Sequence, residues 1–233
     1  MDYTWLNEAA NDKNLTLDDV ERAQRYAKDL LGGLKTLRQF PQGVTVFGSA
    51  RIVSDNEFYQ KALELGEKLA KAGHSVITGG GPGIMEAANR GAFEAGGQSI
   101  GLNIDLPTEQ NLNRFTTDSA KFRYFFARKV MLTFASKVYV FFPGGFGTLD
   151  EFSEILELKH TGKIPPAPLF LFGRTFWQPL DQFFNDKFQA NKLIEPAARE
   201  LYVMTDDVGE IVAATGQIER QSIGDASAKS GAV

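Results

Sequence analysis

The chain contains no cysteine and only two histidines, His74 and His160, among its 233 residues. Without cysteine, disulfide bonds, thiol catalysis and cysteine-ligated metal sites are excluded. Neither histidine has a companion at the spacing of metal ligands. We therefore expect both to be ordinary surface or structural residues, and we expect the protein to need neither a metal nor a cofactor.

A basic excess is also missing, because the formal net charge is −4. This argues against a general nucleic-acid or membrane-surface binder. No stretch approaches the roughly 18 consecutive apolar residues of a membrane span. The opening residues, MDYTWLNEAANDKN, lack the basic start and apolar core of a signal peptide. We expect a cytoplasmic protein with a small-molecule partner, neither nucleic acid nor membrane.

What the sequence does contain is a regular alternation of short apolar runs and helical stretches. We predict strands at residues 44–49, 75–80, 98–104, 137–142, 167–172 and 200–204. We predict helices at 17–40, 56–72, 83–95, 121–136, 148–161, 175–190 and 206–214. Apolar runs without a polar face, alternating with helices, indicate an α/β protein with a parallel sheet covered on both faces. We expect a flexible N-terminus at 1–14, a single domain at 15–215 and a disordered tail at 216–233.

Two glycine-rich turns each follow a predicted strand and precede a predicted helix: TGGGPGIMEAANRGA at 78–92 and PGGFGTLDEF at 143–152. Glycine lets backbone N–H groups approach a ligand, and the helix N-terminus adds partial positive charge, which suits phosphate. In an open parallel sheet, ligands bind at the carboxyl ends of the strands. The pair of turns favours one shared phosphate site, with two tight structural connections as the alternative. Neither turn matches the dinucleotide or P-loop fingerprint.

Charged residues stand beside the second turn and in the apolar helix that precedes it. Thr148 and Glu151 have the spacing of a capping box, which on spacing alone favours a helix cap over a catalytic carboxylate. In KFRYFFARKVMLTFAS, Arg128 and Lys129 interrupt a largely apolar sequence. Charges in a buried helix need partners or a cleft; the alternative is two side chains that extend to the surface.

Together these stretches resemble the LONELY GUY (LOG) family, long mislabelled as lysine decarboxylases. The family signature stands here as GGGPGIM at 79–85, RKVM at 128–131 and PGGFGTLDE at 143–151. The three motifs occur in the family's order, and the resemblance covers roughly residues 42–215. It implies a Rossmann-like α/β fold, with an open parallel sheet and helices on both faces, and a homodimer or an assembly of dimers.

The resemblance also implies an enzyme, a nucleoside 5′-monophosphate phosphoribohydrolase. Such an N-glycosyl hydrolase releases the free base and ribose 5-phosphate from AMP or from cytokinin riboside monophosphates. Arg128 and Glu151 match the family's catalytic positions, which shifts the interpretation of Glu151 from cap to catalytic residue. Thr108 stands where we expect histidine in the longer bacterial members, which leaves the role of its loop open. Seven residues match the family's phosphate and ribose-phosphate positions: Gly80, Gly81, Gly83, Gly144, Gly145, Gly147 and Thr148.

Four further residues are candidate substrate contacts: Arg51, Met85, Glu86 and Lys129. Arg51 follows the first strand and is equally well explained as a surface arginine. Glu86 suits either the base or ribose side of a nucleotide or the dipole of its own helix. Two rival functions stay open: a non-catalytic nucleotide or molybdenum-cofactor carrier of the same fold, and a broader nucleotide nucleosidase of purine or pyrimidine salvage. No lysine stands out for the pyridoxal phosphate Schiff base that a true lysine decarboxylase needs.

Overall fold

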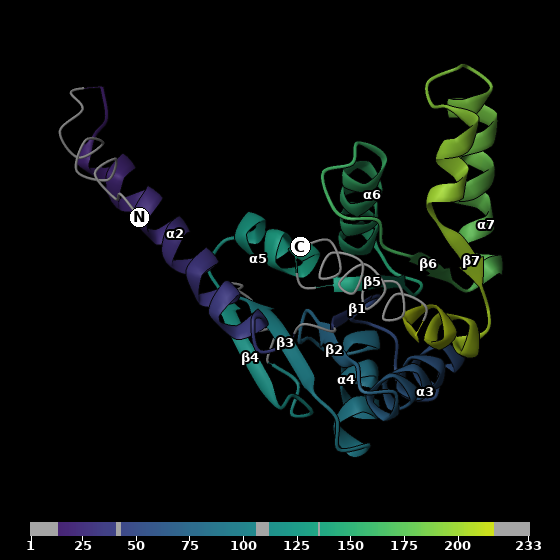
Figure 1. Ribbon diagram of the computed structural model, residues 1–233, viewed down its shortest axis with the longest axis horizontal. Coiled ribbons are helices and arrows are strands. Elements are labelled where there is room, and N and C mark those ends of the chain that lie inside the picture. Colours follow the sequence, from purple (N-terminus) through teal and green to yellow (C-terminus); the bar gives the residue numbers. More distant parts are fainter. Residues whose placement is uncertain (1–13, 41–42, 106–111, 135, 217–233) are drawn as a thin grey trace, which may run out of the picture.

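The computed structural model describes residues 14–216, apart from 41–42, 106–111 and 135. Nearly all of the two predicted terminal segments, and Thr108, lie outside this part of the chain. Seven strands form one sheet in the order β4-β3-β2-β1-β5-β6-β7, and every neighbouring pair is parallel (Figure 1). The predicted Rossmann-like open parallel sheet is confirmed. Within the described residues, no helix is long and apolar enough to cross a membrane.

Six of the strands lie where apolar runs predicted them. All residues of β1, β2, β3 and β6 are buried, as expected for strands that helices cover on both faces. The bounds are β1 (Gly43–Phe47), β2 (Ser75–Thr78), β3 (Ser99–Ile104), β5 (Ser136–Phe141), β6 (Leu169–Phe172) and β7 (Val203–Thr205).

The seventh strand, β4 (Asp118–Phe122), was not predicted, because its sequence DSAKF has no apolar run. It pairs with β3 at the edge of the sheet, and its burial alternates, so Ser119 and Lys121 face away from the core. The helix predicted from residue 121 was wrong at its start. Residues 121–122 belong to β4, and the helix α5 (Phe125–Phe134) begins three residues later.

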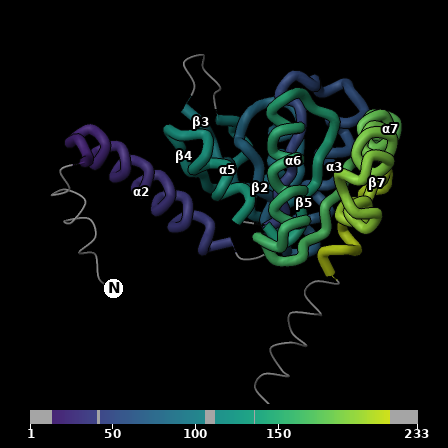
Figure 2. Tube along the Cα trace, turned by 90° about the horizontal axis from the view of Figure 1, so that it is seen from above, coloured from purple at the N-terminus to yellow at the C-terminus, as the bar shows by residue number. Residues whose placement is uncertain are grey.

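The helices form one layer on each face of the sheet (Figures 1 and 2). Strand side chains alternate between the layers: Tyr139 and Phe141 pack with α2, α5, α6 and α7, whereas Val138 and Val140 pack with α3, α4 and the helix at 208–216. The bounds are α2 (Leu17–Leu37), α3 (Glu57–Lys71), α4 (Ile84–Glu94), α6 (Phe146–His160) and α7 (Arg174–Phe183). The predicted helix 175–190 continues after α7 as a π-helix, η1 (Phe184–Gln189), and a 3-10 helix, η2 (Pro196–Leu201), precedes β7.

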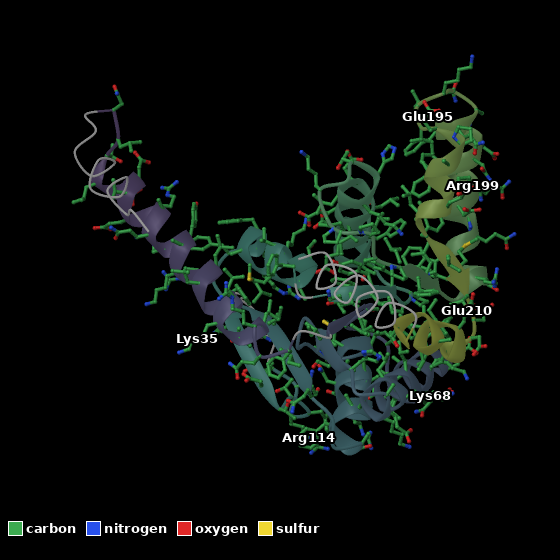
Figure 3. All side chains as sticks on the ribbon, viewed as in Figure 1. Lys35, Lys68, Arg114, Glu195, Arg199 and Glu210 are labelled. Carbon is green, nitrogen blue, oxygen red and sulfur yellow. The ribbon has the colours of Figure 1, made fainter. Side chains whose placement is uncertain are left out.

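The long helix α2 packs on β4 and α5, and its N-terminal half projects beyond the sheet (Figure 2). Thr16 and Asp19 form the capping box that starts it. Asp29 ties it to the body by accepting hydrogen bonds from the backbone N–H groups of Arg123 and Tyr124 at 2.7 and 3.2 Å. Charged side chains cover the outside of the molecule, with Lys68 and Glu210 among those labelled in Figure 3.

The topology fixes where a ligand can bind. From β1 the chain runs outward through β2, β3 and β4, and then returns to place β5 on the other side of β1. The strand order therefore reverses between β1 and β5. In doubly wound folds, the crevice at the carboxyl ends of such a pair of strands is the usual ligand site.

Candidate active site

A cleft of about 490 Å³ opens at this reversal point. The loop after β1, the turn after β2, the helix α5 and the start of α6 all contribute to its walls. The cleft therefore collects groups that lie more than 100 residues apart in the sequence. Its lining residues include Ser49, Arg51, Gly79, Met85, Arg128, Gly145, Phe146, Gly147, Thr148 and Glu151.

The backbone of Ser49 joins the loops around the cleft to one another. Its N–H donates to the carbonyl of Pro143 at 3.0 Å, and its carbonyl accepts from the N–H of Ile84 at 3.0 Å. The first bond reaches the second glycine turn, and the second reaches the first residue of α4. Gly83 lies directly beneath with φ +71°, where a Cβ atom would collide with the Ser49 carbonyl. Glycine at 83 is thus required for the loops to meet.

The two glycine turns differ in what their helices offer to the cleft. The N-terminus of α4 points into the loop of Ser49, whose carbonyl already accepts from Ile84. The helix α6 begins after Gly145 with no side-chain cap, and Gly145, Phe146 and Gly147 are exposed along the cleft. Its first-turn N–H groups and helix dipole therefore face the open space, which is an arrangement suited to an anion.

The predicted capping box at Thr148 and Glu151 was wrong. The helix begins two residues before Thr148, so Thr148 lies inside the first turn and is buried against Gly144. The spacing of three residues is the same within a helix as across a cap, so spacing could not separate the two. Because Glu151 does not serve as a cap partner, its carboxylate is available to the cleft.

The other glycines predicted for phosphate binding lie outside the cleft lining. Gly80 has φ +70° and packs against Leu112 and Gly101. The carbonyl of Gly81, which is buried, accepts a hydrogen bond from Nδ2 of Asn113 at 3.2 Å. Like Gly83 and Gly144, they hold the turns in shape. The glycine of the first turn that does line the cleft is Gly79.

Arg128 reaches the cleft from the buried face of α5. Only 9% of the residue is exposed, and its Nε donates to the carbonyl of Leu102, near the carboxyl end of β3, at 2.8 Å. Burial lowers the pKa of the guanidinium, and the carboxylate of Glu151 opposes this effect. An arginine remains charged in such a site, so Arg128 presents a fixed cation whose orientation is set by a strand carbonyl.

Glu151 enters the cleft from α6, about one turn beyond the open N-terminus. Part of its surface is exposed to the cleft, and protein atoms surround the rest. Burial raises the pKa of Glu151 to about 7, although Arg128 acts in the opposite direction. A carboxyl group with a pKa near neutrality, beside a buried cation in a cleft, is a frequent property of catalytic sites.

The predicted substrate contacts divide into two pairs. Arg51 and Met85 line the cleft. Glu86 and Lys129 point elsewhere: Glu86 accepts a hydrogen bond from the Tyr59 hydroxyl at 3.1 Å, and Nζ of Lys129 forms ion pairs on the outer side of α6. No lysine is among the residues of the described chain that line the cleft.

Six residues of the cleft lining were not among the site residues predicted from the sequence, and three of these have contacts or exposure that indicate a role. Gly79 lies against the Arg128 guanidinium, Ser49 joins the loops, and Phe146 is 93% exposed at the mouth. Their membership in the GGG, FGSA and PGGFG segments was visible, but their roles depend on contacts between distant loops. Of the three, Phe146 carries a signal in the sequence, because a large aromatic residue between two glycines belongs to a turn rather than to the core.

Comparison with known proteins identifies the family. A model described as "Possible lysine decarboxylase" matches residues 85–215. The chain belongs to this family. Two curated relatives align with most of this chain and confirm its resemblance to the LOG-type members of the family. A probable cytokinin riboside 5′-monophosphate phosphoribohydrolase of Oryza sativa is 26% identical over 72% of this chain and 74% of its own length. A cytokinin riboside 5′-monophosphate phosphoribohydrolase of Rhodococcoides fascians is 24% identical over 76% of this chain and 90% of its own.

A solved structure shares the LOG-type fold of this chain. The molybdenum cofactor carrier protein of Chlamydomonas reinhardtii is 26% identical, with a TM-score of 0.57, over 76% of this chain and 98% of its own. The fold therefore occurs in proteins named as hydrolases and in a protein named as a carrier. The residues in the cleft must decide between these functions.

Proposed function

We propose that this chain hydrolyses the N-glycosidic bond of a nucleoside 5′-monophosphate, AMP or a cytokinin riboside monophosphate, and releases the base and ribose 5-phosphate. The observation that carries the proposal is the convergence of Arg128 and Glu151, from two different helices, on the cleft lined by the open N-terminus of α6. The names of the curated relatives support the same reaction.

In this reaction, a water oxygen bonds to the anomeric carbon while the C–N bond breaks. The bonding electron pair leaves with the base, which takes up a proton. Positive charge develops on the sugar, as in glycoside hydrolysis. The carboxylate of Glu151 stabilises this charge or orients the water, and Arg128 stabilises the departing base or holds the nucleotide. Since the deprotonated form of Glu151 is the active one, kcat/KM rises as the pH passes through about 7.

The 5′-phosphate supplies binding energy away from the reacting bond. In our proposal it lies on the N–H groups at Gly145, Phe146 and Gly147, where the helix dipole of α6 favours negative charge. Holding the phosphate there fixes the sugar beside Glu151, about one turn along the same helix. The binding energy of the phosphate thus serves to orient the bond that is cleaved.

The test is base release by the full chain from AMP and from isopentenyladenosine 5′-monophosphate. Glu151→Gln should lower kcat by about a thousandfold, while the affinity for ribose 5-phosphate changes by less than about threefold. Glu157→Gln is the matched control, because Glu157 is an exposed glutamate further along α6. A Glu151→Gln variant with wild-type turnover contradicts the assignment.

The second candidate is a non-catalytic carrier of a phosphorylated ligand, and the similarity to the molybdenum cofactor carrier protein favours it. A carrier needs the anion site at α6 but has no use for a carboxyl group of raised pKa beside it. Binding of nucleotides without release of adenine, guanine or a pyrimidine base from any monophosphate would support the carrier. The rates on these monophosphates relative to isopentenyladenosine 5′-monophosphate separate cytokinin activation from general salvage.

We further propose that the protein works as a homodimer through α5 and α6. The helix α5 presents Phe126, Val130 and Phe134 at intervals of four residues, so they share one face. All three are exposed, Phe134 by 69%. On the neighbouring α6, Phe146 and Leu149 are exposed as well. An apolar surface of this kind on a single chain is typical of a protein interface, and a second copy is the occupant that the family resemblance implies.

A further inference from the structure

We propose that Lys129 is a positioning residue, which joins α5 to α6 through Asp150 and Glu154 and thereby sets the distance between Arg128 and Glu151. The inference rests on the proposed function, because it assigns a role in that reaction to a residue outside the cleft. It replaces the expectation that Lys129 contacts the substrate.

Two pairs of charged residues lie next to each other between α5 and α6: the ion-paired group around Lys129, and Arg128 with Glu151 in the cleft. Nζ of Lys129 lies 2.9 Å from a carboxylate oxygen of Asp150 and 3.0 Å from one of Glu154. Asp150 and Glu154 are four residues apart and therefore share one face of α6. Lys129 follows Arg128 on α5, and Asp150 precedes Glu151 on α6. Each member of the proposed catalytic pair is thus the chain neighbour of a member of the ion-paired group.

The two helices share the core over Tyr139 and Phe141 of the sheet, but their other neighbouring elements differ, so the ion pairs are a direct connection between them. The helix α5 packs mainly on α2 and β3, whereas α6 packs on η2. In the described part of the chain, the two ion pairs that join α5 to α6 both involve Lys129. Arg128 is fixed to β3 through the Leu102 carbonyl. A shift of α6 would therefore move Glu151 away from a stationary guanidinium.

The burial of Lys129 distinguishes this arrangement from an ordinary surface ion pair. Its side chain is only 20% exposed, while that of Glu154 is 35% and that of Asp150 is 62% exposed, so the burial is on the side of the lysine. Exposed pairs contribute little to stability, but a half-buried ammonium with two carboxylate partners holds a defined geometry. Removing the lysine removes the attraction that holds this face of α6 against α5 and leaves its two carboxylates without that counterion.

The same charges act on Glu151 in opposite directions, which gives the proposal a separate electrostatic readout. Burial raises the pKa of Glu151 and Arg128 lowers it, while Asp150 and Glu154 raise it and Lys129 lowers it. These are the charged groups that face it from α5 and α6. Loss of Lys129 should raise this pKa, and loss of the two acids should lower it.

The experiment compares Lys129→Met with the double variant Asp150→Asn, Glu154→Gln in the full chain, with AMP as substrate. Both should lower kcat about tenfold to a hundredfold, because a displacement on the order of 1 Å is enough for such losses. KM should change by less than about threefold. The pH midpoint of kcat/KM should move upward in Lys129→Met and downward in the double variant. Parallel losses with opposite pH shifts separate positioning from a purely electrostatic effect.

Two controls complete the test. Lys129→Arg keeps both ion pairs and should stay within about threefold of wild-type kcat. Lys159→Met removes another half-buried lysine, one that donates to the Leu201 carbonyl and has no link to α5, and it should leave kcat and the pH midpoint unchanged. Sedimentation of each variant checks that the oligomeric state is the same.

Wild-type kcat in Lys129→Met would overturn the proposal, and a rise in KM alone would return Lys129 to substrate binding. If the wild-type chain releases no base from any nucleotide, the proposed function fails instead. The positioning group is then tested by carbon-13 NMR of the Glu151 carboxyl group. An unchanged titration midpoint in Lys129→Met would reject it without reference to catalysis.

Discussion

The guanidinium of Arg128 lies where a side chain at residue 79 would have to be. A Cβ atom on Gly79 would collide with Nη2 of Arg128 and would lie 2.9 Å from the sulfur of Met85. The absence of a side chain in the first glycine turn therefore makes room for a cation, rather than for a ligand. This relationship explains why the turn needs glycine at a position where φ is not positive.

Gly79→Ala should consequently impair catalysis more than stability. The guanidinium has to leave its place beside the cleft, and we expect kcat to fall by about a hundredfold. The free energy of unfolding should fall by only about 1–2 kcal/mol, because the displaced atoms are the end of a flexible side chain. Base release and urea denaturation measure the two effects.

The control for this variant is Gly32→Ala in the exposed part of α2. A Cβ atom at Gly32 meets nothing within 4 Å, so alanine should stabilise the helix by about 0.5–1 kcal/mol and leave kcat unchanged. A Gly79→Ala protein with full activity would show that Arg128 does not need its observed position.

The pKa of Glu151 makes stability depend on pH. In the unfolded chain the carboxyl group loses its proton near pH 4.5, whereas in the folded protein burial holds the proton until about pH 7. Between these values the folded state binds more protons, so its stability falls as the pH rises. The decrease from this group is at most about 3 kcal/mol.

Urea denaturation of the wild type and Glu151→Gln at pH 5 and pH 8 measures this difference. Glutamine does not titrate, so the variant should lose less stability than the wild type over this interval. Equal losses in the two proteins would mean that the folded carboxyl group titrates near its ordinary pKa.

The proposed dimer is tested by placing charge on the apolar face of α5. Val130→Glu with Phe134→Glu should convert a wild-type dimer into a monomer, because two carboxylates cannot be buried unpaired at an interface. Sedimentation equilibrium measures the mass. Val53→Glu is the control: Val53 is 64% exposed in the loop before α3, and this change should leave the mass unaffected. A monomeric wild type would contradict the proposal directly.

Most of the sheet could be predicted from the sequence, because buried parallel strands consist of short runs of apolar residues. The edge strand β4 could not, since DSAKF buries little and its pairing with β3 is a contact between distant segments. The start of α6 was misplaced for a similar reason. Residues 145–147 contain no side chain that caps a helix, so the sequence does not mark the start of α6. The turn before it is hydrogen-bonded to the loop of Ser49 through the Pro143 carbonyl.

The candidate site shows the same division. The motifs pointed to Arg128 and Glu151, and both line one cleft. The two glycine turns looked equivalent in sequence, yet in the described part of the chain the first N–H group of α4 is occupied, whereas the first residues of α6 are exposed along the cleft. The difference comes from the hydrogen bond between Ile84 and the carbonyl of Ser49. Because these two residues are 35 positions apart, the spacing of residues within either motif cannot reveal this hydrogen bond.

The backbone hydrogen bonds of Ser49 to Pro143 and Ile84 also affect which residues around the cleft can change in related proteins. An anion site made of main-chain groups persists when surrounding side chains mutate, provided that the loops stay joined. The exposed side chains of Arg51 and Phe146 at its rim carry no part of that main-chain site. If the proposed function holds, selectivity for one base over another is free to change at the rim, while the main-chain contacts to the phosphorylated sugar are retained.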